Sequence, residues 1–70
     1  MPHCVYIIQS LKDNRYYIGE TSNAGERLNF HNSGRQRSTK NRIPFRSILV
    51  EEYPNRDEAL KREKQIKSWK

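Results

Sequence analysis

The chain has 70 residues, enough for one small domain with a thin core, because a domain of this size buries only about 60% of the surface that its unfolded chain exposes. Hydrophobic residues are 33% of the chain and charged residues 31%, with no apolar run long enough to cross a membrane, which excludes a membrane-spanning protein. Fourteen Lys and Arg against eight Asp and Glu give a net charge of +6, so we expect a polyanionic partner, nucleic acid first. The single cysteine, Cys4, excludes an internal disulfide, and the N-terminus lacks the pattern of a secretory signal, so we expect a cytoplasmic protein.

The first predicted element is a β-hairpin. Residues 4–8 and 16–19 are rich in the β-branched and aromatic side chains that strands favour, and residues 12–15, Lys-Asp-Asn-Arg, have the composition of a hairpin turn. We therefore expect two paired strands that carry three tyrosines. Strand packing is the simplest role for such side chains, since tyrosine combines an apolar ring with a polar tip.

The register of this hairpin decides whether its tyrosines could do more than pack. An even-length turn pairs residues of opposite parity, so we expect Tyr6 and Ile8 to share a face with Tyr17 and Gly19. Two hydroxyl groups would then lie on one surface, beside a glycine that leaves open space. Tyr16 would lie on the opposite face.

Residues 24–33 are predicted to form a helix. Asn23 and Glu26 have the spacing of a capping box, and Gly34 is suited to the position just after a helix. The helix has few apolar residues, so it can pack on a sheet only along a narrow seam, formed by Ala24, Leu28 and His31.

The segment 35–44 has no helical or strand period and contains four cations. We expect a mobile basic loop. Residues 45–53 then alternate as a third strand, whose middle, Ile48-Leu49-Val50, is apolar on both faces. A strand covered on both sides would show this pattern, so we expect one helix on each face of the sheet.

A second helix is predicted after Pro54, because Asn55 and Glu58 repeat the capping-box spacing. It is expected to run to the end of the chain without a stop signal, so the helix was either trimmed or continues in the natural protein. Its apolar residues are Ala59, Leu60, Ile66 and Trp69.

Three polar residues on the predicted helices stand out. Glu63 is surrounded on three sides by the apolar face of its helix; it could form a simple ion pair with Lys67, or it could be a single carboxylate that holds a hard cation against a phosphate. Arg27 and His31 lie four residues apart, so they project from one side of the first helix. A solvated polar face would explain them, but a fixed cation beside a proton carrier also suits phosphodiester cleavage.

Together these residues resemble the GIY-YIG nuclease domain, and most of all its small stand-alone bacterial members related to the nuclease domain of the excision-repair incision subunit. The resemblance covers residues 1–70 as a single domain. It is carried by the order of five elements: Cys4-Val5-Tyr6, Tyr17-Ile18-Gly19, Arg27, His31 and Glu63. Cys4 and Val5 stand where the family name has Gly and Ile, and Glu20 stands where some members have a lysine.

The resemblance implies an α+β fold, an α/β sandwich in which a three-stranded antiparallel sheet is flanked by helices in the order β-β-α-β-α. It also implies a metal-dependent endonuclease. Tyr6 and Tyr17 would line the site, Arg27 would contact the scissile phosphate, His31 would assist proton transfer, and Glu63 would bind Mg²⁺ or Mn²⁺. A free tyrosine has a pKa of about 10, so Tyr6 could act as a general base only if neighbouring cations favour its phenolate.

The basic loop and the outer lysines of the second helix would hold the nucleic-acid backbone without reading sequence. These cations are Arg35, Arg37, Lys40, Arg42, Lys64 and Lys67. Our first hypothesis is a metal-dependent DNA endonuclease of low sequence specificity, acting in DNA repair or recombination, with a protein partner supplying its targeting. The alternatives are a nucleic-acid-binding module without efficient cleavage and a small basic scaffold protein.

Overall fold

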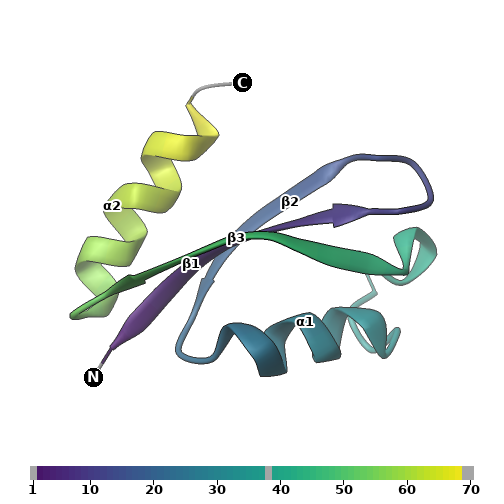
Figure 1. Ribbon diagram of the computed structural model, residues 1–70, viewed down its shortest axis with the longest axis horizontal. Helices are drawn as coiled ribbons and strands as arrows, with labels where there is room; N and C mark the ends of the chain where they lie inside the picture. Colours follow the sequence, from purple (N-terminus) through teal and green to yellow (C-terminus); the bar gives the residue numbers. More distant parts are fainter. Residues whose placement is uncertain (1, 38, 69–70) are drawn as a thin grey trace.

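The chain folds in the order β-β-α-β-α, which confirms the predicted α+β class (Figure 1). The structure is a computed structural model that describes residues 2–37 and 39–68. Its elements are β1 (His3–Ser10), β2 (Tyr16–Thr21), α1 (Ala24–Asn32), the short 3-10 helix η1 (Lys40–Arg42), β3 (Phe45–Tyr53) and α2 (Arg56–Lys67). The three strands form one antiparallel sheet with β1 in the middle, in the order β2-β1-β3.

The hairpin of β1 and β2 has the predicted register. Tyr6 lies opposite Gly19 and Ile8 lies opposite Tyr17, so these four residues share one face of the sheet. The turn is closed by a bond of 2.9 Å from the Ser10 backbone N–H to the carbonyl of Arg15. Asn14 has a φ of 62°, a left-handed conformation that asparagine tolerates better than most residues.

A helix covers each face of the sheet, as expected, with α1 and α2 on opposite sides in Figure 1. Each face therefore has its own small core. The core under α2 consists of Val5, Ile18, Ala59 and Ile66. The core under α1 consists of Tyr6, Ile8 and Phe45, with Tyr17, Leu28 and Ile43 packed beside them.

The strand β3 is less covered than we expected. It lies at an edge of the sheet, where the side chains of Ile48 and Val50 are 42% and 48% exposed. A bulge explains part of the exposure: Ile7 pairs with Leu49 and Ile8 with Ser47, which leaves Ile48 without a partner on β1. The expectation that the middle of this strand is buried on both faces was wrong.

Both helices begin at the predicted caps. The side chain of Asn23 accepts a 3.0 Å bond from the backbone N–H of Glu26, and the side chain of Asn55 accepts one from Glu58 at the same distance. Gly34, with a φ of +79°, follows α1 as expected. The described part of α2 ends at Lys67, and Trp69 lies outside the described residues. Within residues 2–37 and 39–68, no helix has both the length and the apolar character that crossing a membrane requires.

The segment 35–44 is more structured than the predicted mobile loop. It contains η1, and it docks on the hairpin turn through two bonds, from Ser10 Oγ to the carbonyl of Arg42 (2.5 Å) and from the Leu11 N–H to the carbonyl of Pro44 (2.8 Å). Thr39 is 1% exposed. The sequence period could not indicate this, because the partners of the segment lie on β1 and α1.

The side chain of Asn32 joins the end of α1 to the start of β3. Its Oδ1 accepts the N–H of Phe45 at 2.7 Å, and its Nδ2 donates to the carbonyl of Phe45 at 3.1 Å. We expect Asn32→Ala to lower the free energy of unfolding by about 1–3 kcal/mol, because two backbone groups of a buried residue lose their partner. Urea denaturation measures this loss. Asn29→Ala, at an exposed position of the same helix, is the control, and equal effects of both substitutions would contradict the assignment.

Candidate active site

Tyr6 lies at the centre of the candidate site. It is 3% exposed, and its ring covers Gly19 of the neighbouring strand. A Cβ atom at Gly19 would lie 2.5 Å from the Tyr6 hydroxyl oxygen and 2.7 Å from Cζ. Both distances are shorter than those at which a Cβ atom approaches non-bonded atoms in proteins. The space beside this glycine, which we expected to be open, is thus filled by the tyrosine itself.

Two side chains of α1 reach the Tyr6 hydroxyl. Arg27 donates from Nε at 3.4 Å, and Nε2 of His31 lies 3.2 Å from the same oxygen. The two residues are one helical turn apart, as their spacing predicted. The Arg27 guanidinium also lies over the ring of Phe30, 5.0 Å from its centroid, so the arginine is held between β1 and its own helix.

His31 is fully buried and has a second partner. Its Nδ1 lies 3.1 Å from Oγ1 of Thr39, and its ring centroid lies 4.9 Å from that of Tyr17. Four of the predicted site residues therefore come together on the α1 face: Tyr6, Tyr17, Arg27 and His31. Sequence reasoning missed Thr39, because it lies in the segment that we interpreted as a loop.

Burial sets the protonation of Tyr6 and His31. Burial raises the pKa of Tyr6 above 10.0; the hydrogen bond and the charge of Arg27 act in the opposite direction, and the charges of Tyr17 and Glu63 add to the rise. Burial also lowers the pKa of His31 below 6.5, and the charge of Arg27 lowers it further. At neutral pH Tyr6 is therefore a phenol and His31 a neutral imidazole. Arg27 alone does not favour the phenolate enough to outweigh burial.

The lowered pKa of His31 predicts a dependence of stability on pH. The unfolded chain, with a histidine pKa of about 6.5, binds more protons at acidic pH than the folded chain does. The contribution of His31 to stability is thus complete above about pH 6.5 and is lost as the pH falls below it. Urea denaturation should show that the free energy of unfolding falls more between about pH 7.5 and about pH 5.5 in the wild type than in His31→Gln. Equal losses would contradict the assigned direction.

Glu63 lies on α2, which packs on the opposite face of the sheet from these four side chains. Its side chain is partly buried, and its charge is near enough to contribute to the raised pKa of Tyr6. The alternative that we left open, an ion pair with Lys67, is present with a long N–O distance of 3.5 Å. Among the described residues, no hydrogen bond joins Glu63 directly to the four side chains on the α1 face.

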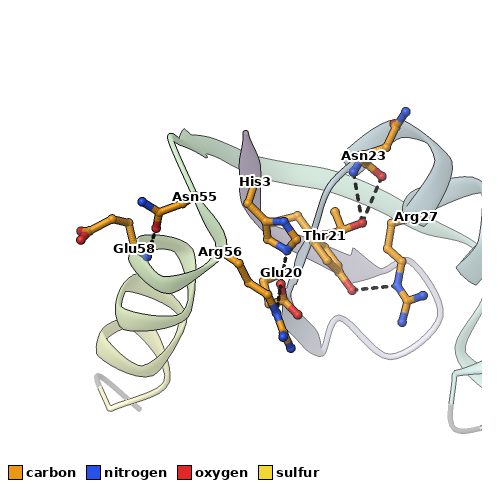
Figure 2. Close-up of polar contacts among 9 residues, drawn as sticks. His3, Glu20, Thr21, Asn23, Arg27, Asn55, Arg56 and Glu58 are labelled. Carbon is orange, nitrogen blue, oxygen red and sulfur yellow. Dashed lines mark hydrogen bonds and ion pairs between the residues drawn. The ribbon is translucent and has the colours of Figure 1, made fainter. Parts of the chain in front are cut away.

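Glu20 faces away from the candidate site. It lies opposite Val5, on the α2 face of the sheet, where its carboxylate contacts His3 and, at 3.5 Å, Nε of Arg56 (Figure 2). The acid that follows the Tyr17-Ile18-Gly19 motif therefore does not oppose anion binding at the Tyr6 hydroxyl.

The six predicted backbone-binding cations are spread over two parts of the surface. Arg35 lines an open groove of about 510 Å³ along α1, which Arg27 and Phe30 also line. Arg42 makes a 3.7 Å contact with Asp13, and Lys67 contacts Glu63. The other three are exposed: Arg37, Lys40 and Lys64. Of the six cations, Arg35 is the one that lines this groove beside Arg27.

Comparison with known proteins identifies the family. Residues 2–70 match the family model of the GIY-YIG catalytic domain. The chain belongs to the GIY-YIG family. It is 38% identical over 68 residues to the UPF0213 protein SH2523 of Staphylococcus haemolyticus, and the aligned segment covers 96% of this chain and 82% of that protein. It is 35% identical over 68 residues to the UPF0213 protein BH0048 of Halalkalibacterium halodurans, covering 96% of this chain and 71% of the relative.

A solved structure supports the same assignment. The solution NMR structure of the UPF0213 protein BH0048 from Bacillus halodurans is similar to this GIY-YIG domain with a TM-score of 0.58 and 35% sequence identity, over 97% of this chain and 72% of that chain. The predicted resemblance is confirmed. GIY-YIG domains are generally nucleases that act on DNA and use divalent metal ions.

Glu63 is the carboxylate that this GIY-YIG domain would offer to a metal ion. Its side chain is partly shielded from water, and its carboxylate lies 3.5 Å from Nζ of Lys67. In the part of the chain that the structure describes, no three His, Cys, Asp or Glu side chains form a group that could hold a metal. Glu63 would therefore share Mg²⁺ or Mn²⁺ with water and substrate oxygens, which is the usual way in which proteins bind Mg²⁺.

Proposed function

We propose that this chain is a metal-dependent endonuclease that hydrolyses phosphodiester bonds in DNA with low sequence specificity. The observation that carries the proposal is the Tyr6 hydroxyl, which meets a fixed cation and a neutral imidazole within 3.4 Å. Hydrolysis of a phosphodiester needs both groups, one for the charge that builds on the phosphate and one to take a proton from water.

The attacking water would pass its proton through Tyr6 to His31. As the water oxygen bonds to phosphorus, the phenol oxygen takes the water proton and releases its own to Nε2 of His31. The bond from phosphorus to the departing oxygen breaks, and that oxygen takes a proton from solvent. Because Tyr6 gives up a proton as it gains one, its raised pKa does not prevent this role, whereas it would prevent catalysis by a free phenolate.

The other side chains would position the substrate. Arg27 uses Nε for Tyr6, and its remaining N–H groups would bind oxygens of the scissile phosphate. Tyr17, against the His31 ring, would orient the water or the phosphate. Glu63 would hold Mg²⁺ or Mn²⁺, which when bound stabilises negative charge on the departing oxygen.

Binding would depend on charge rather than on sequence. Cations in the segment 35–44 and on α2 would contact phosphates, which fix the position of DNA without reading bases. A protein partner would then supply targeting. The likeness to the nuclease domain of the excision-repair incision subunit supports a role in DNA repair or recombination, in the cytoplasm.

A second candidate function is a nucleic-acid-binding module without efficient cleavage. The burial of Tyr6 favours it, because a tyrosine that is 3% exposed and whose pKa is raised meets water only if the surrounding side chains move.

Incubation with supercoiled plasmid separates the two candidates. We expect conversion to nicked circles with Mg²⁺ or Mn²⁺ and none with chelator, and the Tyr6→Phe variant, purified in parallel, controls for contaminating nucleases. Salt-dependent binding without nicking in any metal would contradict the endonuclease and support the binding module.

A further inference from the structure

We propose that Thr39 is a positioning residue of the reaction centre, whose hydroxyl keeps the proton of the His31 ring on Nδ1 and so leaves Nε2 ready to accept the proton of Tyr6. The catalytic consequence rests on the proposed nuclease function. The position of the ring proton does not, because it is a property of the folded chain alone.

The hydroxyl of Tyr6 determines which nitrogen of His31 carries the proton. This phenol is almost fully buried, and its oxygen has two neighbours, Nε of Arg27 at 3.4 Å and Nε2 of His31 at 3.2 Å. An arginine can only donate hydrogen bonds, so within residues 2–37 and 39–68 the acceptor for the Tyr6 O–H is the histidine. Nε2 of His31 must then carry no proton, and the neutral ring carries its proton on Nδ1.

The Nδ1–H group in turn needs an acceptor in a dry environment. Oγ1 of Thr39 lies 3.1 Å away and is the partner that the fold provides. Thr39 can donate its own proton to the carbonyl of Gln36, 3.4 Å away, which leaves its oxygen free to accept from His31. This assignment agrees with the polar groups of residues 2–37 and 39–68, where no buried side-chain nitrogen or oxygen lacks a partner.

The opposite tautomer is less favourable. With its proton on Nε2, His31 would present a second donor to the Tyr6 oxygen, and the buried phenol proton would have no acceptor. The groups packed around the ring do not compensate for this: Arg27 is a cation, and Tyr17, Phe30 and Phe45 contact the ring through their aromatic faces and edges.

Thr39 also connects two parts of the proposed site. It lies within the segment 35–44, which carries four of the predicted backbone-binding cations, and it directly precedes η1. The segment that would hold DNA therefore also sets the orientation of the histidine that would receive the proton.

Long-range ¹H–¹⁵N NMR of the histidine rings at about pH 7.5, without DNA or metal, tests the assignment. We expect the His31 proton on Nδ1 in the wild type and in Thr39→Ser, which keeps the hydroxyl. In Thr39→Val, which has the same shape without the hydroxyl, the ratio of the two tautomers should move toward Nε2–H by about tenfold. His31→Gln assigns the signals against those of His3.

Plasmid nicking gives the second readout. If the rate follows the fraction of His31 with a free Nε2, Thr39→Val should nick more slowly than the wild type by the same factor as that fraction falls in the NMR measurement, and Thr39→Ser should recover most of the loss. A residue that only fills space would be replaced by valine without either change.

The proposal is overturned if wild-type His31 carries its proton on Nε2, a result that needs no variant to fold, or if folded Thr39→Val keeps the wild-type ratio of the two tautomers. Absence of nicking in every variant, including the wild type, would overturn the proposed nuclease function instead, because the NMR measurement uses neither substrate nor metal.

Discussion

Replacing Tyr6 by phenylalanine should lower plasmid nicking by about two to four orders of magnitude, the usual contribution of a group that transfers a proton in the transition state. The substitution removes the oxygen that links Arg27 to His31 and keeps the ring that covers Gly19. The fold should therefore survive, and initial rates of nicking at saturating metal measure the loss of chemistry.

Tyr16→Phe is the matched control for this substitution. Tyr16 belongs to the same hairpin, but it is 53% exposed and lies on the opposite face of the sheet from Tyr17. It should nick at the wild-type rate. If both variants lose activity equally, or if neither does, Tyr6 is not the proton-transfer group.

Gly19→Ala should lower the stability of the protein and displace Tyr6 from the site. The new Cβ would lie 2.5 Å from the Tyr6 hydroxyl oxygen, so the tyrosine ring must leave its place over β2. Forcing extra volume into a packed core costs about 1–3 kcal/mol, and the displaced hydroxyl would lose Arg27 and His31. We expect lower stability in urea denaturation together with a strong loss of nicking.

Gly25→Ala serves as the reference for this methyl group. Gly25 lies on α1. The atom nearest to a Cβ added there would be Oδ1 of Asn23 at 3.6 Å, an ordinary contact. Alanine there should raise stability by about 0.5–1 kcal/mol through helix propensity. If Gly19→Ala is tolerated as well as Gly25→Ala, the packing of Tyr6 on Gly19 does not constrain the site.

The sequence predicted those features that depend on local spacing. The parity of the hairpin predicted that Tyr6, Tyr17 and Gly19 share one face, and the capping residues Asn23 and Asn55 indicated the starts of both helices. The same parity also places Glu20 on the far face, because it directly follows Gly19.

Features that depend on contacts distant in sequence could not be predicted. The segment 35–44 has no period, yet Ser10 and His31 hold it in place, so Thr39 becomes buried without any local signal. Likewise, the apolar pattern of β3 does not distinguish a central strand from an edge strand. In the fold β3 is an edge strand, and Ile48 and Val50 are exposed.

Contacts bring Arg27, His31 and Tyr17 to Tyr6, whereas Glu63 is proposed as the metal ligand from the family resemblance. Glu63 is therefore the residue on which the proposed reaction centre most needs a direct test.

The most direct measurement is a titration of nicking rate against Mg²⁺ and Mn²⁺ for the wild type, Glu63→Gln and Glu58→Gln. Glu58 is an exposed glutamate in the first turn of the same helix and controls for the lost charge. We predict metal-dependent nicking by the wild type and by Glu58→Gln, and background rates for Glu63→Gln at every metal concentration. Nicking by Glu63→Gln with the wild-type rate and metal dependence would contradict the proposal that Glu63 holds the metal ion of the nuclease.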